Sequence, residues 1–300
     1  MPDRGPWFAG IIVPVTTPFD PVTGDIAPIH FRDNLRRWVA HPLDGFLLFG
    51  STGEGILLEL EEKERLLGYA RDLVPSDRSI IVGISAESTR SAIAQSRRLA
   101  EAGADAVLVH PPVYFGSVLT DAALRDFYVA LADASPVPVL VYNMPKYTRI
   151  NLEPGLVGEL ARHPNVAGLK DSSGDLKRFA AYTEACGGEC SLLVGSGALL
   201  YSALELGATG GIVALGLLAP AECTALYRAF ISGESADAGL IQERIGPVHK
   251  EIVGRFGVPG VKAALDLLGY AGGKTRPPLV NLSPREREEV ARVLQRAGLL

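Results

Sequence analysis

The sequence predicts an α/β fold, a TIM (β/α)8 barrel with a helical C-terminal extension. Eight short runs rich in valine, isoleucine and leucine alternate with longer amphipathic stretches, which is the pattern of strands covered by helices. The runs are almost continuously apolar, so each strand should be buried on both faces. Eight such units are better explained by a closed barrel than by an open sheet.

The predicted strands follow one another along the first three quarters of the chain. They are GIIVPV (10–15), GFLLFG (45–50), SIIVGI (79–84), ADAVLVH (104–110), VPVLVYN (137–143), VAGLK (166–170), SLLVGS (191–196) and GGIVAL (210–215). Helix-like segments lie between them, for example 61–73, 88–103 and 121–134. Several of these segments open with Ser, Thr or Asp and close with Gly or Pro, the usual cap and stop residues.

After residue 216 the pattern becomes helical only. The helical stretches are 221–233, 246–257, 258–269 and 283–298. No linker-like segment separates them from the barrel. We therefore divide the chain into a (β/α)8 barrel, residues 1–220, and a C-terminal helical region, residues 221–300, packed on the barrel.

Composition narrows the classes of function. With 300 residues, 47% of them hydrophobic, the chain is globular and can bury a substantial core. A net charge of -5 gives no basic surface for nucleic acid or an anionic membrane. The first residues lack the apolar core of a signal peptide, and no run reaches the ~18 apolar residues of a membrane span. We expect a cytoplasmic protein that handles small molecules.

Metal and disulfide chemistry have little support in the sequence. The three cysteines, Cys186, Cys190 and Cys223, are an odd number in a chain without an export signal, so a disulfide framework is not expected. No histidine pair or further cysteine completes a metal-binding set around them, and the five histidines are scattered. We expect no metal site.

In TIM barrels the chemistry lies at the carboxyl ends of the strands. At those ends the sequence places Ser51 and Thr52 after the second strand, Tyr114 after the fourth, Tyr142 on the fifth and Lys170 on the sixth. These residues supply two hydroxyls, two phenols and an amine that can act as a nucleophile.

Lys170 is the most informative of these residues. A lysine next to an acid is usually one half of a solvated ion pair, and Asp171 follows directly. Adjacent strand residues point to opposite faces, however, so an inward Lys170 cannot easily be neutralised by Asp171. An amine desolvated in a barrel has a lowered pKa and can attack a carbonyl to form a Schiff base. This is the chemistry of class I aldolases.

The segment GSTGEG follows the second strand and precedes a helix expected to begin near Glu59 or Leu60. Its turn, residues 50–53, can direct backbone N–H groups and two hydroxyls into the barrel mouth, where they would bind a small anion such as a carboxylate. The alternative is an ordinary βα loop with a serine cap. For Tyr142 the alternatives are a core tyrosine with a satisfied hydroxyl and a proton shuttle beside the Schiff base.

Together these motifs resemble the dihydrodipicolinate synthase and N-acetylneuraminate lyase family, pyruvate-dependent class I enzymes built on a TIM barrel. The resemblance covers nearly the whole chain. It is carried in order by VPVTTPF, GSTGEG, PPVYF, VYNMP, GLKDSSGD, VGSG, FGVPGVKAALDLLG and RPPL. The 28-residue step from Tyr142 to Lys170 suits the family's pair of phenol and Schiff-base lysine.

The resemblance implies a role for each candidate residue. Lys170 would form the iminium with the 2-oxo carbon of pyruvate or a derivative, and Tyr142 would transfer protons. Ser51 and Thr52 would hold the carboxylate of the pyruvyl group and, with Tyr142, would complete a proton relay. Tyr114 matches the tyrosine that family members commonly insert into a neighbouring subunit, which implies a homodimer or homotetramer.

Three further residues complete the predicted substrate site, and no metal or organic cofactor is implied. They are Gly53, Tyr147 and Ile212. Tyr147 marks a departure from the family pattern, because dihydrodipicolinate synthases normally carry an arginine at that position for the carboxylate of the aldehyde substrate. Lys146 and Arg149 are close, but a shifted cation does not reproduce a bidentate arginine.

Because of this departure, the sequence favours a pyruvate-dependent lyase, aldolase or dehydratase acting on a 2-oxo-3-deoxy sugar acid or a 4-hydroxy-2-oxo acid. The alternative is 4-hydroxy-tetrahydrodipicolinate synthase, which condenses pyruvate with aspartate semialdehyde. A more remote alternative is a non-catalytic sensor that binds a small oxo acid on the same barrel. A pure binding protein has no chemical reason to keep the whole catalytic set, so the enzyme is the preferred hypothesis.

Overall fold

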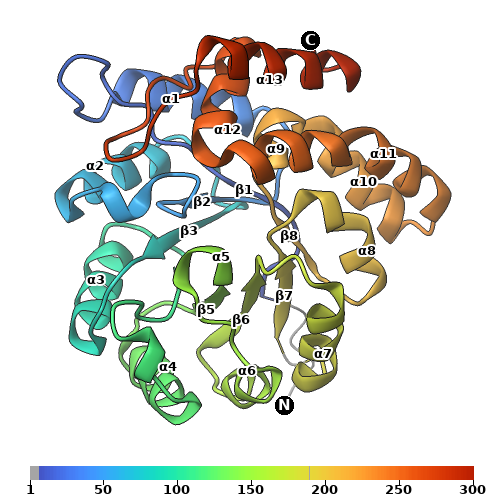
Figure 1. Ribbon diagram of the computed structural model, residues 1–300. Coiled ribbons are helices and arrows are strands. Elements are labelled where there is room, and N and C mark those ends of the chain that lie inside the picture. Colours follow the sequence, from blue (N-terminus) through green and yellow to red (C-terminus); the bar gives the residue numbers. More distant parts are fainter. Residues whose placement is uncertain (1–6, 189) are drawn as a thin grey trace.

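The computed structural model describes residues 7–188 and 190–300. Eight parallel strands form a closed barrel in chain order, as predicted (Figure 1). The strands are β1 (Gly10–Pro14), β2 (Gly45–Leu48), β3 (Ser79–Ile84), β4 (Ala106–Val109), β5 (Val139–Asn143), β6 (Val166–Asp171), β7 (Ser191–Val194) and β8 (Gly210–Ile212). Each predicted strand is confirmed, with its ends shifted by at most three residues.

Helices surround the barrel and follow the strands in turn. The longer ones are α1 (Pro28–Val39), α2 (Leu60–Arg71), α3 (Thr89–Glu101), α4 (Asp121–Ala134), α6 (Pro154–Ala161), α7 (Leu176–Cys186) and α8 (Leu200–Glu205). Short helical turns lie in the loops after the strands: η1 (Gly55–Leu57), η2 (Gly116–Val118), α5 (Pro145–Thr148), η3 (Gly197–Leu199) and α9 (Leu215–Leu218).

The helix starts follow the capping residues expected from the sequence. Ser88 accepts a hydrogen bond from the Ser91 N–H at the start of α3, and Thr120 caps α4 in the same way. Helix α2 begins at Leu60, where it was expected, with a reciprocal pair of side-chain contacts between Glu59 and the third helical position. The end of the GSTGEG loop is therefore fixed by the helix that follows it.

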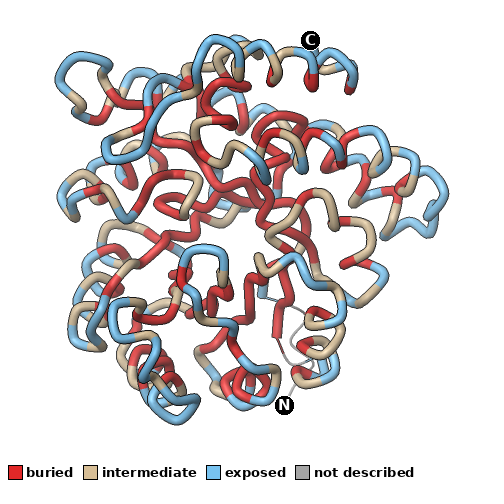
Figure 2. Tube along the Cα trace, viewed as in Figure 1, coloured by how far each residue is buried: buried red, intermediate tan, exposed pale blue. Residues whose placement is uncertain are grey.

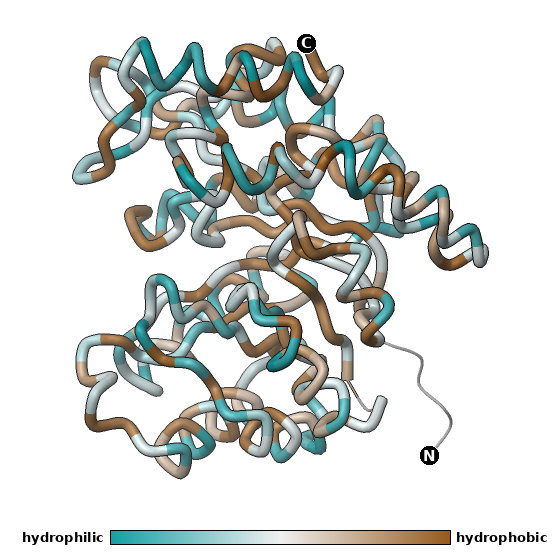
Figure 3. Tube along the Cα trace, turned by 45° about the vertical axis from the view of Figure 1, so that its right-hand side comes forward, coloured by the Kyte–Doolittle hydropathy of each residue, from teal (hydrophilic) through white to brown (hydrophobic). Residues whose placement is uncertain are grey.

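The hydrophobic core has two layers, one inside the barrel and one between the strands and the helices. The inner layer includes Ile12, Leu47, Ile81, Leu108, Leu140, Leu193 and Ile212. Figure 2 shows the strands buried along their length, and Figure 3 shows hydrophobic residues concentrated in the same central region. Burial on both faces explains why the strand sequences are continuously apolar.

The C-terminal helices gather on one side of the barrel (Figure 1). They are α10 (Pro220–Ile231), α11 (Ser235–Val248), a π-helical segment η4 (His249–Gly254), α12 (Arg255–Leu267) and α13 (Pro284–Arg296). Helix α10 contacts β1 and α12 contacts α9, so this region packs on the barrel. Helix α11 begins earlier than expected, and the chain bends within α12 at Gly257, where φ is 62°. The boundary at residue 220 stays a prediction.

Residues 7–188 and 190–300 contain no helix that is both long enough and apolar enough to cross a membrane.

We predict that Lys63 on α2 makes stability depend on pH. The side chain is buried, and burial lowers the pKa of its amine from 10.5 to about 8, against an opposing effect of Glu59. Below pH 8 the buried charge costs about 3 kcal/mol. Between pH 8 and 10.5 the folded state loses this proton before the unfolded state does, so stability rises with pH.

Lys63→Met should be more stable than the wild type at pH 7, and the difference should shrink by pH 10.5. Urea unfolding of both proteins across this range measures it, and a difference that does not vary with pH would contradict it.

Candidate functional site

Tyr142 and Lys170 lie side by side inside the barrel. They are paired in register on the adjacent strands β5 and β6. Tyr142 is 5% exposed and Lys170 is 4% exposed, and the Lys170 Nζ lies 4.4 Å from the centre of the Tyr142 ring. The structure therefore places the predicted phenol beside the predicted nucleophile.

Lys170 points inward because β6 contains a bulge. Two consecutive residues of β5 pair with Val166 and Gly168, so Ala167 is an extra residue in β6. Ala167 belongs to the inner core layer, whereas Leu169, two residues on, belongs to the outer layer. In a regular strand these two residues would share a face. The bulge reverses the alternation, and as a result Lys170 faces the barrel interior.

Glycine at position 168 permits this bulge. A Cβ atom added there would overlap the carbonyl oxygen of Ser191 on the neighbouring strand β7. Only a residue without a side chain can bring the two backbones so close. The local sequence VAGLK thus encodes both the close approach and the inward lysine.

Asp171 points away from Lys170, as the sequence predicts. Its carboxylate accepts hydrogen bonds from Asn143 Nδ2 at 2.8 Å and from the Ser173 hydroxyl at 2.8 Å. Burial raises the pKa of Asp171, and these hydrogen bonds oppose that shift. The carboxylate is therefore occupied outside the barrel, and it organises the loop after β6.

The GSTG turn is held in an unusual backbone conformation. Phe49 and Glu54, on either side of it, both have positive φ angles, 60° and 55°, which are costly for residues other than glycine. Gly53 donates its N–H to Gly50 O at 3.0 Å and accepts from the Thr17 hydroxyl at 2.7 Å. Gly53 is consequently tied into the turn itself.

A cavity of about 230 Å³ brings together most of the predicted site. It is lined by Ser51, Thr52, Tyr142, Tyr147, Lys170 and Ile212, together with Lys146, Ser172, Ser196 and His249. The structure does not bring Gly53 into this cavity, because its backbone packs against the residue that follows β1: a Cβ atom there would lie 2.6 Å from the Val15 carbonyl oxygen. Among the described residues that line the cavity none is Asp or Glu.

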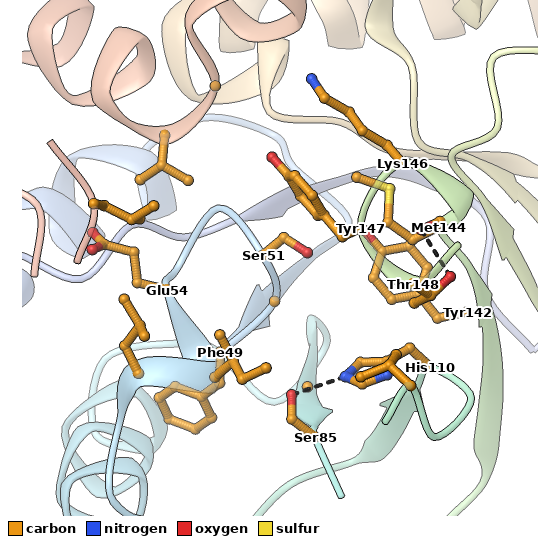
Figure 4. A pocket seen from close by; sticks show the side chains of 18 of the residues that line it. Phe49, Ser51, Glu54, Ser85, His110, Tyr142, Met144, Lys146, Tyr147 and Thr148 are labelled. Carbon is orange, nitrogen blue, oxygen red and sulfur yellow. Dashed lines mark hydrogen bonds between the residues drawn. The ribbon is translucent and has the colours of Figure 1, made fainter. Parts of the chain in front are cut away.

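A second cavity, of about 550 Å³, adjoins the first and shares Ser51, Tyr142 and Tyr147 with it. Figure 4 shows these side chains around one opening, with His110 and Ser85 facing them from below. Much of this second cavity is apolar, including Ile56 and Val280 at its rim. The smaller cavity, which we call the Schiff-base cavity after the role predicted for Lys170, thus has an open side toward the larger one.

Tyr114 lines neither cavity of its own chain. Its side chain is 80% exposed and packs edge-on against Phe115, with the ring centres 4.9 Å apart. The Glu87 carboxylate accepts hydrogen bonds from the backbone N–H groups of Val113 and Tyr114, each at 2.9 Å. These bonds fix the loop with its aromatic tip facing outward.

Among the residues of the loop after β5, Tyr147 and Lys146 line the Schiff-base cavity and Arg149 does not. Burial raises the pKa of the Tyr147 phenol, and the nearby Tyr142 adds to the shift. Lys146 Nζ donates to the Gly254 carbonyl at 3.1 Å, and its side chain extends away from Ser51 in Figure 4. Arg149 is exposed. Tyr147 is therefore the aromatic residue that this loop contributes to the cavity of Lys170.

Two serine–histidine contacts were not found by sequence reasoning. Ser196 Oγ lies 3.2 Å from His249 Nε2, and Ser85 Oγ lies 3.1 Å from His110 Nε2. The partners are far apart in the sequence, and a lone histidine in a helical stretch gives no signal of such a contact. The one local feature that points to His249 is structural: the π-helical segment that begins there is of a kind often seen at functional sites.

A buried ion pair supports the GSTG turn from the C-terminal region. Lys262 Nζ on α12 lies 2.5 Å from Glu54 Oε1, and both side chains are at most 1% exposed. The other carboxylate oxygen of Glu54 accepts from the Arg276 N–H at 2.8 Å, and Lys262 also donates to the Lys274 carbonyl at 2.7 Å. Burial lowers the pKa of Lys262, and the facing Glu54 carboxylate opposes that shift.

Comparison with known proteins identifies the family. The sequence model that describes the dihydrodipicolinate synthetase family matches residues 7–297 of this chain. The chain belongs to this family. It is 33% identical to the 4-hydroxy-tetrahydrodipicolinate synthase of Syntrophus aciditrophicus (strain SB), over 98% of this chain and 99% of that one. Members of the family are lyases and synthases that form a lysine Schiff base with pyruvate, so this protein is an enzyme of the class I aldolase type.

Two solved structures of this family are also similar. The chloride-inhibited dihydrodipicolinate synthase from Acinetobacter baumannii, complexed with pyruvate, superposes with a TM-score of 0.92 at 27% identity, over 97% of this chain and 99% of that one. A prophage protein of the family from E. coli K12, also in complex with pyruvate, gives 0.91 at 27% identity, over 98% and 100%.

We predict that Glu54 and Lys262 stabilise the fold only when both are present. Glu54→Gln leaves the buried Lys262 ammonium without a countercharge and should cost about 3 kcal/mol. Lys262→Met should cost a similar amount, while the double variant should recover most of the loss. Urea unfolding measures all three. Asp33→Asn is the matched control, because it breaks the exposed ion pair with Arg36 and should cost under about 1 kcal/mol. Additive losses in the double variant would show that the pair is not coupled.

Proposed function

We propose that the enzyme is a Schiff-base lyase, aldolase or dehydratase that acts on a 2-oxo-3-deoxy sugar acid or a 4-hydroxy-2-oxo acid. The observation that carries this proposal is Tyr147. It lines the cavity of Lys170. By the family resemblance it stands where dihydrodipicolinate synthases normally carry an arginine. A phenol suits a hydroxylated or neutral substrate chain, whereas an arginine suits a second carboxylate.

In the proposed mechanism Ser51 and Thr52 hold the substrate carboxylate, and Lys170 attacks the C2 carbonyl. Loss of water from the carbinolamine gives an iminium. In the aldolase reaction Tyr142, in a relay with Thr52, accepts the proton of the C4 hydroxyl. The C3–C4 bond then breaks, and its electron pair moves into the iminium to give an enamine and an aldehyde. Protonation at C3 and hydrolysis release pyruvate and free Lys170. Neither a metal nor an organic cofactor takes part.

We also propose that the working form is a homodimer or homotetramer, in which Tyr114 completes the relay of a neighbouring subunit. Its exposed position and the rigid loop behind it support this role, since a fixed aromatic tip can be inserted without further ordering. A cytoplasmic location remains part of the proposal. Pyruvate is the expected common product or substrate.

The second candidate function is 4-hydroxy-tetrahydrodipicolinate synthase. It is favoured by the names of the curated relatives, including that of Haloarcula marismortui, 33% identical over 96% of this chain and 93% of that one. In that case the carboxylate of aspartate semialdehyde would need a cation other than the usual arginine. Lys146 is the cation of the same loop that lines the cavity.

We predict that Lys170 forms a covalent adduct with pyruvate. Borohydride reduction in the presence of pyruvate should add one reduced pyruvyl group to the wild type and none to Lys170→Ala, as measured by intact mass. Circular dichroism of the variant controls for folding. Pyruvate binding without any adduct on the wild type would overturn the lyase and would leave the oxo-acid sensor as the remaining hypothesis.

We predict that the residue at position 147 decides between the two candidate reactions. The wild type should cleave or dehydrate 2-oxo-3-deoxy sugar acids faster than it condenses pyruvate with aspartate semialdehyde. Tyr147→Arg should raise the condensation about tenfold, since a charge-assisted hydrogen bond contributes about 1.5–3 kcal/mol. Tyr147→Phe is the matched control without a cation and should not show this gain. Faster condensation than cleavage by the wild type would establish the synthase instead.

A further inference from the structure

Ser196 and His249 form a hydrogen-bonded pair in the wall of the Schiff-base cavity. Ser196 follows β7, and His249 opens the π-helical segment η4 from the C-terminal region. Both side chains line the same cavity as Lys170. The pair is thus placed to meet the part of a substrate that extends beyond its 2-oxo acid end.

The backbone fixes which ring nitrogen of His249 carries the hydrogen. The N–H of Gly197 donates to His249 Nδ1 at 3.2 Å, so Nδ1 must be an acceptor. A neutral imidazole then carries its hydrogen on Nε2, which donates to Ser196 Oγ at 3.2 Å. Burial and the nearby Lys146 ammonium lower the pKa of His249 to about 4, which keeps the ring neutral at physiological pH.

Ser196 is consequently left as a donor. Its oxygen accepts from His249, and its own hydrogen is available for another acceptor. Apart from Lys146 and Lys170, the polar side chains in this wall belong to serine, threonine, tyrosine and histidine. Such a surface suits hydroxyl oxygens, because hydroxyls both donate and accept.

The second serine–histidine pair has the opposite polarity. His110 Nδ1 lies 2.8 Å from the Pro111 carbonyl oxygen, which can only accept, so Nδ1 carries the hydrogen. In the neutral ring His110 Nε2 then accepts from the Ser85 hydroxyl at 3.1 Å, the contact drawn in Figure 4. The hydroxyl hydrogen of Ser85 is therefore already used in this bond and cannot be donated to a substrate. Ser85 also lines the larger cavity, which Lys170 does not line.

We propose that Ser196, oriented by His249, donates a hydrogen bond to a hydroxyl oxygen on the substrate chain beyond C4. It thereby selects a polyhydroxylated 2-oxo acid over an unsubstituted one of the same length. This assignment rests on the proposed function and narrows its two substrate classes to the 2-oxo-3-deoxy sugar acids. Ser196 is a specificity-determining residue, and His249 is a positioning residue.

The test compares two six-carbon acids, 2-oxo-3-deoxygluconate and 2-oxohexanoate, as ligands for Lys170. For each acid the readout is the concentration that half-saturates borohydride-trapped adduct, measured by intact mass. All adducts are counted, so the readout does not depend on whether the bound acid is then cleaved or dehydrated. The wild type should prefer the hydroxylated acid.

Ser196→Ala should reduce this preference about tenfold and leave the trapping of pyruvate within twofold. His249→Asn should reduce it in the same direction, because the shorter side chain can still accept from Gly197 but no longer reaches Ser196. Ser85→Ala is the matched control. It removes the serine of the other pair and should leave the preference unchanged.

The outcomes separate this inference from the proposed function. Wild type that traps pyruvate but shows no preference for the hydroxylated acid would overturn the inference, as would a preference that survives in Ser196→Ala. Wild type that traps neither pyruvate nor the longer acids would overturn the proposed function itself.

Discussion

The site depends on one irregularity, the bulge in β6. A parallel strand that is buried on both faces has an apolar environment on each side. Burial alone therefore does not decide which face of the strand a lysine occupies. The extra residue at Ala167 changes the alternation, and the close approach of Gly168 to Ser191 makes that change possible. Lys170 then faces the interior beside Tyr142, and Asp171 is left to organise the outer loop. A regular strand would exchange the places of Lys170 and Asp171.

The strain of the GSTG turn is balanced by contacts from the far end of the chain. Positive φ angles at Phe49 and Glu54 persist only where the surroundings fix them. The Glu54 carboxylate is fixed by Lys262 on α12 and by the backbone of Arg276. The C-terminal region therefore has a direct part in the site, since it supports the turn that presents Ser51 and Thr52 and also supplies His249.

The sequence predicted the parts of the fold that depend on local patterns. Continuous apolar runs identified the eight strands, and position at a strand end identified Tyr142 and Lys170 as candidates. The same reasoning did not find the bulge, although a glycine inside a strand is its usual signal. It also placed Gly53 at the substrate. In the structure Gly53 is hydrogen-bonded within the turn and does not line the cavity, and its part in binding stays a prediction. Contacts between distant segments, such as Ser196 with His249, depend on how the barrel and the C-terminal helices pack, and no local pattern specifies them.

Substrate selection in this barrel can be understood as a choice of hydrogen-bond polarity at fixed positions. An arginine at position 147 would offer only donors and a full charge, which suits a second carboxylate. Tyr147 can both donate and accept, and Ser196 is held as a donor by a histidine whose hydrogen is placed by the Gly197 backbone. In the proposed reaction Lys170, Tyr142 and the GSTG turn act on the first four carbons of the substrate. Tyr147 and Ser196 can therefore change without disturbing the Schiff base. In this proposal Lys170 and Tyr142, which make and break bonds, stand on strands, whereas Tyr147, Ser196 and His249 stand on loops and on the C-terminal segment that meets them.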